Sequence, residues 1–386
     1  MFKKNLCIIT GSRAEYGLLS RLCKLIKKDK RFNLQIIVTG SHLSKEHGNT
    51  INEIKKDNLK INKKIANLIS SDRKTDMIKS TGIALIKFSK VIKKLNPYLV
   101  IVLGDRYEIF SATIASYFLN VPIAHIHGGE LTYGAIDDAI RHSITKMSWF
   151  HFVATKNYKK RVIQLGENNK RVFNVGSLGV ENIKKTKLIT KKNIEKKLNI
   201  KFKDRNLLIA YHPETIDKNF SSNGFKEILK SLENLDYTFL IFTAPNADAG
   251  GLLIKKEIYK FVKKNPYKAI FFASLGSLNF LSLLNIVDGI IGNSSSGIIE
   301  APSLQTGTIN IGKRQNGRDM SSSIINCKPN KKSIEKSLKI LFSDKYIRSL
   351  KSISNIYEKK DTSIKIFNKI KNTAIPKNLN KIFNDL

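Results

Sequence analysis

Three clusters of ionisable side chains in the first half of the chain are of the types that carry out acid–base chemistry. They are Val102–Glu108, His125–Glu130 and Asp137–His142, and together they hold five carboxylates, three histidines and two arginines. The first two clusters each follow a short apolar run, Leu99–Leu103 or Val121–Ile126, that predicts a buried strand. Ligands of open α/β sheets bind beyond the carboxyl ends of such strands. One Asp-Arg pair after a strand is more often a structural ion pair, but three clusters together favour a polar active-site cleft.

A turn of small and charged residues, Gly11–Gly17, separates a predicted strand at Leu6–Thr10 from a predicted helix. Backbone N–H groups at the start of a helix attract anions, so this turn and its Arg13 form a candidate phosphate site. The spacing is neither GxGxxG nor that of a P-loop, which argues against a dinucleotide and against Walker-type ATP binding. Taken alone, a plain tight turn with Arg13 in solvent explains the pattern equally well.

The second half of the chain also places polar residues after apolar runs. His212 follows such a run; a lone histidine before proline is more often structural, but at a strand end it is a candidate for phosphate contact or acid–base work. Gly292–Gly297 holds three serines before a helix that carries Glu300. Serine capping explains part of this pattern, yet we favour a phosphate site with Glu300 on the ribose hydroxyls and Arg314 nearby. The polar segment Asn246–Gly251 by itself indicates only a loop.

Length and composition predict a globular protein of two domains. The chain has 386 residues, of which 41% are hydrophobic and 26% charged, and this is more than a single core usually holds. No apolar run approaches the roughly 18 residues that span a bilayer, and Leu6–Ile9 is too short for a signal-peptide core. Three widely separated cysteines predict neither a disulfide framework nor a zinc site. We therefore expect a cytoplasmic protein with no membrane partner and no bound metal.

The formal charge of +37 is compatible with nucleic-acid binding, since clustered Lys and Arg neutralise phosphates. The lysines, however, are spread along amphipathic segments such as Lys191–Lys203 and Lys255–Lys268, and no recognition helix, zinc finger or RNA-binding motif is found. We therefore favour solvated lysine faces and no nucleic-acid partner. A positive field still attracts a diphosphate substrate.

Apolar runs and helical patterns alternate along both halves of the chain. In the first half, strands are predicted at Leu6–Thr10, Leu34–Thr39, Leu99–Leu103, Ile123–His127, Phe150–Ala154 and Arg171–Val175, and helices at Tyr16–Lys28, Ile78–Leu95, Ile109–Leu119 and Asp137–Met147. In the second half, the predicted strands are Leu207–Tyr211, Thr238–Thr243, Ala269–Ala273, Gly289–Ile291 and Thr308–Ile311. Such alternation indicates parallel βαβ units. We expect two doubly wound α/β domains, at residues 1–178 and 179–363, and a helical tail at 364–386 that packs back on the first domain.

The motifs above occur together, and in this order, in one family. From about residue 6 to 320 the chain resembles the hydrolysing UDP-N-acetylglucosamine 2-epimerases, most closely their NeuC-like members of sialic- and legionaminic-acid synthesis. The segments that carry the resemblance are Gly11–Gly17, Gly104–Phe110, His125–Glu130, Asp137–Met147, Lys159–Glu167, Gly176–Glu181, His212–Thr215, Asn246–Gly250, Gly292–Glu300 and Thr308–Arg314. The resemblance implies a GT-B fold, in which two Rossmann-like domains hold the nucleotide sugar in the cleft between them. We also expect a homo-oligomer, either a dimer or a tetramer.

The resemblance implies a reaction that frees a sugar from UDP and inverts it at C2. UDP leaves C1, a carboxylate removes the C2 proton to give a 2-acetamidoglucal, and water adds at C1 while an acid protonates C2 from the other face. From UDP-N-acetylglucosamine the products are UDP and N-acetylmannosamine. This path needs several carboxylates but no metal, nicotinamide or other cofactor. Relatives that act on UDP-2,4-diacetamido-2,4,6-trideoxyglucose share the same motifs, so that substrate is the alternative.

Carried over residue by residue, the resemblance assigns the catalytic acids to Asp105, Glu130 and Asp137. His127 stands where some members of the wider superfamily carry a glutamate, and the division of acid and base roles among these four residues stays open. The resemblance also implies that the substrate and its UDP group are bound by Arg13, Arg106, His212, Asn246, Ser274, Leu275, Ser294, Ser295, Glu300 and Arg314, with His212 a further acid–base candidate.

Two functions of other kinds are less favoured. A retaining GT-B glycosyltransferase would not need an acid cluster on the donor sugar. A basic RNA-binding protein would be expected to interleave aromatic residues with a basic stripe, and the sequence has no such stripe.

Overall fold

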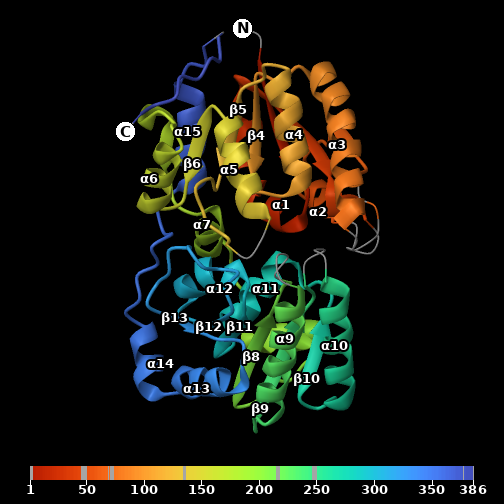
Figure 1. Ribbon diagram of the computed structural model, residues 1–386, viewed down its shortest axis with the longest axis vertical. Helices are drawn as coiled ribbons and strands as arrows, with labels where there is room; N and C mark the ends of the chain where they lie inside the picture. Colours follow the sequence, from red (N-terminus) through yellow and green to blue (C-terminus); the bar gives the residue numbers. More distant parts are fainter. Residues whose placement is uncertain are drawn as a thin grey trace. The chain divides into compact units, whose positions relative to one another are not determined.

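The computed structural model describes residues 3–44, 50–67, 69, 74–133, 136–213, 218–245, 250–376 and 378–385. The chain divides into two compact units (Figure 1). Unit 1 comprises Met1–Glu130, Asp137–Glu181 and Lys359–Leu386, and unit 2 comprises Leu131–Ile136 and Asn182–Glu358. The C-terminal residues therefore belong to unit 1, whereas a six-residue segment within the first half belongs to unit 2. The chain leaves unit 1 after Glu181 and returns to it at Lys359. We expected these two boundaries after residues 178 and 363.

Unit 1 is built on a seven-stranded parallel sheet in the order β3-β2-β1-β4-β5-β6-β7. Its strands are β1 Lys4–Thr10, β2 Phe32–Thr39, β3 Lys63–Ile65, β4 Leu99–Leu103, β5 Ile123–Ile126, β6 Phe150–Val153 and β7 Val172–Asn174. Its helices are α1 Arg13–Lys28, α2 Ile51–Lys56, α3 Lys74–Leu95, α4 Tyr107–Phe118, α5 Asp137–Met147, α6 Lys156–Gln164 and α15 Thr362–Asn372, with short 3₁₀ helices η1 Gly40–Leu43 and η2 Asn169–Arg171. Helix α7, Leu178–Lys185, spans the boundary with unit 2.

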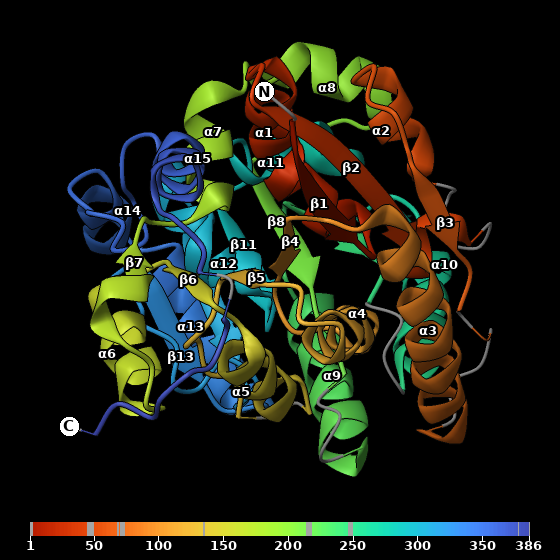
Figure 2. The ribbon, with the colours of Figure 1, turned by 90° about the horizontal axis from the view of Figure 1, so that it is seen from above.

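Both faces of this sheet are covered by helices, because its strands are apolar on both sides. On one face, Leu6 and Ile8 of β1 pack with Leu19 of α1 and Ile366 of α15. On the other face, Cys7 and Ile9 of β1 belong to a second core cluster. This cluster also contains Phe88 of α3, Ile109 of α4 and Ile144 of α5. Figure 2 shows α1 and α15 on one side of the sheet and α3 and α4 on the other.

Unit 2 has a six-stranded parallel sheet in the order β10-β9-β8-β11-β12-β13. Its strands are β8 Arg205–Ala210, β9 Thr238–Thr243, β10 Ala269–Phe272, β11 Gly289–Gly292, β12 Gly307–Ile311 and β13 Ile324–Cys327. Its helices are α8 Lys191–Leu198, α9 Lys218–Glu233, α10 Gly251–Lys264, α11 Gly276–Leu284, α12 Ser295–Ile299, α13 Lys331–Leu341 and α14 Asp344–Leu350, with η3 Ala301–Leu304. One face packs against α9, α10 and α13, and the other against α8, α11 and η3; Figure 1 shows α9 and α10 side by side.

The expected doubly wound architecture is confirmed in both units. All eleven predicted strands are present, and the bounds of β4, β9 and α5 are those predicted. The prediction missed β3 and β13, which are short strands at the sheet edges. It also placed His127 in a strand, which is wrong because β5 ends at Ile126. Within the described part of the chain, no helix has the length and apolar character needed to cross a bilayer.

Candidate active site

Each sheet reverses its strand order at one pair of neighbouring strands, β1 and β4 in unit 1 and β8 and β11 in unit 2. Loops that leave the carboxyl ends of such a pair run to opposite faces of the sheet and leave room for a ligand. In unit 1, Asp105 lies in one of these loops and Arg13 is the first residue of the helix after the other; in unit 2 the loops carry His212 and Ser294. These four predicted site residues therefore flank the switch point of each sheet.

Asp105 lies in the loop between β4 and α4, and its carboxylate accepts a hydrogen bond from Arg141 of α5. The Arg141 side chain is only 3% exposed. Its Nη1 also donates to the backbone carbonyl of Glu130 at 2.8 Å. One guanidinium thus ties the side chain of one predicted acid to the backbone of another. Arg141 belongs to the predicted cluster Asp137–His142 but was not among the predicted site residues. Its place in an amphipathic helix directly after predicted acids was the signal that could have identified it.

His127 and Glu130 lie in the turn that follows β5, and His127 Nδ1 lies 3.3 Å from Glu130 Oε1. Both residues are buried. The φ angle of His127 is 68°, in the left-handed region, which is why the strand stops before it. The turn packs so closely that a Cβ on Gly129 would lie 2.6 Å from the carbonyl oxygen of Tyr158. The two glycines of this motif therefore allow a histidine and a carboxylate to be buried together.

His125, two residues earlier, has a structural role. It lies within β5, where Nε2 contacts the carbonyl oxygen of Gly104 at 2.8 Å and Nδ1 contacts the hydroxyl of Thr145 at 3.0 Å. Burial lowers the pKa of His125 to about 3, so the ring is neutral near pH 7. His125 therefore links the loop that carries Asp105 to helix α5 without adding charge to the site.

The remaining predicted residues of unit 1 stand at helix starts. Arg13 is the first residue of α1 and Asp137 the first residue of α5. Arg106 is the N-cap residue of α4, and its Nε donates to Glu108 at 2.7 Å. An acidic residue at a helix start is favoured by the helix dipole, whereas an arginine there is held by carboxylates instead.

In unit 2, His212 is joined to Asn293 across the switch point. The His212 backbone N–H donates to the side-chain carbonyl of Asn293 at 2.7 Å, and the Asn293 amide donates to the His212 carbonyl at 2.9 Å. The backbone carbonyl of Asn293 accepts hydrogen bonds from Arg314 at 3.1 Å and Gln315 at 2.7 Å. Asn293, missed by the sequence analysis, therefore fixes two predicted ligand-binding residues.

The charge state of His212 follows from this surrounding. Burial, and then the charge of Arg314, lower the pKa of His212 to about 3. The ring is neutral near pH 7, so it can donate or accept a hydrogen bond but carries no charge.

The serine motif follows β11. A Cβ on Gly292 would lie 2.1 Å from the carbonyl oxygen of Ala210, so the chain can enter the motif here only with glycine. Ser294 is the N-cap of α12 and accepts a hydrogen bond from the Ser296 backbone N–H. The capping interpretation is thus correct for Ser294, and Ser295 begins the helix. The helix ends at Ile299, so Glu300 caps its C-terminus and is not carried within it.

The other predicted residues of unit 2 are Ser274, Leu275 and Asn246. Ser274 and Leu275 precede α11, and the Leu275 side chain is part of the hydrophobic core. Asn246 lies outside the described residues.

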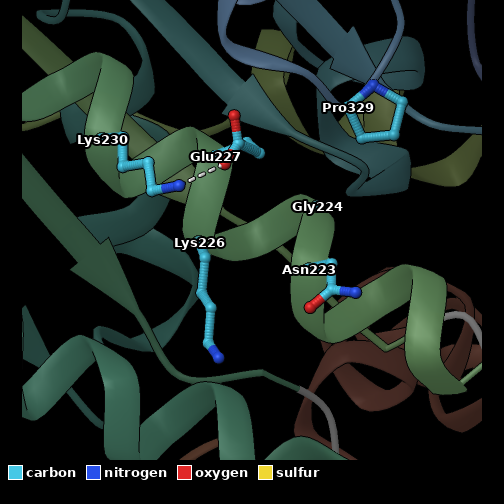
Figure 3. Close-up of a pocket in the computed structure, with 6 residues that line it drawn as sticks. All are labelled: Asn223, Gly224, Lys226, Glu227, Lys230 and Pro329. Carbon is cyan, nitrogen blue, oxygen red and sulfur yellow. Dashed lines mark hydrogen bonds and ion pairs between the residues drawn. The ribbon is translucent and has the colours of Figure 1, made fainter.

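Two surface hollows of unit 2 contain none of the predicted site residues. The first, of about 250 Å³, is lined by Asn223, Gly224, Lys226, Glu227, Lys230 and Pro329. Figure 3 shows Lys230 turned toward Glu227, with which it forms a hydrogen bond of 2.7 Å, and Lys226 pointing away from it. The second, of about 390 Å³, lies along the outer face of α10 and includes Leu252 and Tyr259. Both have lysines among their lining residues, and neither is lined by the buried polar groups found at the switch points.

Comparison with known proteins gives consistent matches over most of the chain. A family model described as UDP-N-acetylglucosamine 2-epimerase matches residues 24–371. A GDP/UDP-N,N'-diacetylbacillosamine 2-epimerase (hydrolyzing) of Campylobacter jejuni is 47% identical over 86% of this chain and 86% of its own. The polysialic acid biosynthesis protein P7 of Escherichia coli is 40% identical over 97% of this chain and 95% of its own.

Solved structures show the same fold. The Methanocaldococcus jannaschii UDP-GlcNAc 2-epimerase, solved with UDP-GlcNAc and UDP, superposes with a TM-score of 0.79. The match covers 95% of this chain and 99% of that one at 22% sequence identity.

Proposed function

Since this chain belongs to the UDP-N-acetylglucosamine 2-epimerase family, we propose that it is a hydrolysing 2-epimerase, which turns a UDP-linked 2-acetamido sugar into UDP and the free sugar inverted at C2. The observation that carries this proposal is the cluster in which Arg141 joins Asp105 to the Glu130 turn at a sheet switch point. Such a cluster supplies several carboxylates at fixed positions, and the proposed chemistry uses carboxylates to move protons.

The reaction needs those acids because the C2 hydrogen of a sugar is not acidic. The C1–O bond breaks, and UDP leaves with its electron pair. The positive charge that remains at C1 makes the C2 proton acidic. A carboxylate takes that proton, and the electrons of the C2–H bond form the double bond of a 2-acetamidoglucal. Water then adds its oxygen at C1, and an acid returns a proton to C2 from the opposite face. The net change is hydrolysis of the glycosyl bond with inversion at C2.

We assign the proton transfers to Asp105, Glu130 and Asp137, with His127 as a partner of Glu130. Unit 2 would supply the groups that bind the nucleotide. Ser294, Ser295 and Arg314 would contact the diphosphate, and Glu300 the ribose. Neutral His212 would contribute a hydrogen bond instead of a charge, because its pKa is lowered to about 3.

Two substrates are candidates, and they differ at C4 and C6 of the sugar. UDP-N-acetylglucosamine is the substrate that the motif pattern predicts. N,N'-diacetylbacillosamine, a 2,4-diacetamido-2,4,6-trideoxy sugar, is favoured by the name of the 47% identical relative, which includes both GDP and UDP forms.

The test is to incubate the purified protein separately with UDP-N-acetylglucosamine and with the UDP- and GDP-linked diacetylbacillosamine in heavy water, and to identify the products by mass spectrometry and NMR. The proposal requires a free sugar that carries deuterium at C2. Asp105→Asn should lower turnover by roughly 10²–10⁴-fold. Asp57→Asn, which removes a carboxylate that pairs with Lys24, should leave turnover unchanged. A product without deuterium at C2 would exclude the elimination path. Failure to turn over any of the three nucleotide sugars would exclude the proposed function.

A further inference from the structure

A buried pair of carboxylates flanks Arg106 beside the β1–β4 switch point of unit 1. Glu108, in the first turn of α4, is fully buried, and its Oε1 lies 2.7 Å from Arg106 Nε. Glu15, in the first turn of α1, is 6% exposed, and its Oε1 lies 3.8 Å from the same nitrogen. The Arg106 side chain is 23% exposed. One half-buried guanidinium is therefore held from within by two carboxylates that belong to helices on opposite faces of the sheet.

The loops after β1 and β2 close over this pair. A Cβ on Gly11 would lie 2.7 Å from Glu108 Oε1, and so would a Cβ on Gly40, whose φ is +57°. At Gly11 the Glu108 side chain fills this space, whereas at Gly40 the Gly11 carbonyl oxygen, also 2.7 Å away, and the positive φ add to the same constraint. Glu108 Oε2 is buried and has no hydrogen-bond partner among the residues that the structure describes.

Helix capping explains part of this arrangement but not all of it. Ser12 and Glu15 form the pattern of a capping box: Ser12 Oγ accepts from the Glu15 backbone N–H, and the Glu15 carboxylate accepts from the Gly11 backbone N–H at 2.7 Å. Capping accounts for a Glu or Gln at position 15. It does not account for Glu108, which meets the same guanidinium from another helix.

Two carboxylates beside a single arginine cannot both ionise without a net negative charge in a buried place. Burial, and then the charge of Glu108, raise the pKa of Glu15 to about 7, while Arg106 and the hydrogen bonds from Gly11 and Ser12 oppose this rise. Below that pH Glu15 is mostly protonated and adds no charge beside Arg106. Above it Glu15 is mostly ionised and adds a negative charge there.

We propose that Glu15 and Glu108 are positioning residues that, when Glu15 is protonated, hold the Arg106 guanidinium for the diphosphate of the substrate. This inference rests on the proposed function, because it takes the anion at Arg106 to be the nucleotide diphosphate. An incoming diphosphate is negatively charged and binds more tightly when the carboxylate pair carries a proton. Ionisation of the pair repels the diphosphate, so nucleotide binding and protonation of the pair favour each other.

The coupling predicts a pH dependence that a purely structural role would not produce. In the wild type, the UDP dissociation constant should rise between pH 6 and pH 8 by up to about tenfold more than in Glu15→Gln, because ionisation of one group with a pKa near 7 changes an apparent constant by about that factor over this range. Glu15→Gln removes the group that ionises in this range. Glu108→Gln removes only the second cause of the raised pKa of Glu15, after burial, and should therefore reduce the pH dependence without abolishing it. The ionisation of UDP itself is the same for all proteins and cancels in the comparison. Glutamine at position 15 also preserves the capping box.

The experiment is isothermal titration of UDP into the wild type, Glu15→Gln, Glu108→Gln and Arg106→Gln at pH 6 and pH 8. The matched control is Glu181→Gln, another buried carboxylate of unit 1, which accepts hydrogen bonds from Ser363 and should keep the wild-type pH profile. Arg106→Gln should weaken UDP binding at both pH values. If UDP binds, Arg106→Gln weakens it, and the wild type and Glu15→Gln share one pH profile, the positioning role is wrong while the proposed function stands. If UDP does not bind the wild type, the proposed function itself fails.

A second measurement uses only the wild type and so does not depend on the folding of a variant. Infrared difference spectra at pH 8, recorded with and without UDP, should show that the C=O band of a protonated carboxyl group grows when UDP binds. An unchanged carboxyl band would overturn the proposal.

Discussion

Replacement of Arg141 by methionine tests whether this residue holds the proposed acids in place. Methionine fills a similar volume but removes the donors that serve the Asp105 carboxylate and the Glu130 carbonyl. The side chain is 3% exposed, so water cannot readily replace it. We therefore expect losses in both stability and catalysis.

The size of the stability loss follows from the surroundings of the pair. Removal of one partner from a buried ion pair costs about 3–5 kcal/mol, but the Asp105 side chain is 21% exposed and can be partly hydrated. The lower end of that range is therefore expected, about 3 kcal/mol including the lost hydrogen bond to Glu130. Displacement of a reacting group by about 1 Å can cost roughly 10²-fold in rate, so kcat should fall by about that factor. UDP affinity should stay near the wild-type value, because Arg141 contacts acids and not the proposed nucleotide groups.

Urea unfolding, UDP release rates and UDP titration measure these three quantities. The matched control is Arg171→Met: Arg171 lies over the Trp149 ring at 4.1 Å, in the same unit, and its loss should leave kcat unchanged. In a double variant with Asp105→Asn, the effects on kcat should not add, since both changes disrupt one pair. A wild-type kcat in Arg141→Met, with the protein folded, would refute the positioning argument.

The structure supports three further predictions. Arg314→Gln and Ser294→Ala should each weaken UDP binding, by about 1.5–3 kcal/mol where a charge-assisted hydrogen bond is lost; unchanged dissociation constants in calorimetry would remove these residues from the nucleotide site. Lys381→Met should lower the free energy of unfolding by about 2 kcal/mol and speed proteolysis of the C-terminal tail, because Lys381 Nζ lies 2.7 Å from buried Glu167. The control is Lys365→Met, at an exposed lysine. Equal cleavage rates in the two variants would contradict this anchoring role. Burial lowers the pKa of His151 from 6.5 to about 4, so the unfolded chain binds a proton below pH 6.5 that the folded protein does not, and stability is lost as the pH falls toward 4. Between pH 7 and pH 5 the wild type should therefore lose about 2 kcal/mol more than His151→Gln, and parallel urea-unfolding curves for the two proteins would show that His151 is not buried in its neutral form.

Local pattern was sufficient for the fold class, for a physical reason. Strands buried on both faces of a parallel sheet must be continuous apolar runs, and parallel strands need long helical connections. Leu99–Leu103 and Thr238–Thr243 have this character, and both were predicted with the bounds that the structure shows. The edge strands β3 and β13 were missed because they are short and partly exposed, so their sequences carry little apolar signal.

Residue type and spacing also indicated which residues to examine, because polar groups directly after a buried strand must lie at the edge of the sheet. The order of residues along the chain was enough to show that Asp105 follows one strand and His212 another. It did not determine their partners. Arg141 lies 36 residues from Asp105, and Asn293 lies 81 residues from His212.

Those partners become known from the folded structure alone, since they depend on which strands become neighbours. Because β4 lies beside β1, the helices that follow these strands bring Glu108 and Glu15 to one guanidinium. No periodicity along the chain distinguishes that arrangement from two separate surface carboxylates. Burial and the approach of the second charge, which together raise the pKa of Glu15 to about 7, arise only when the sheet has formed.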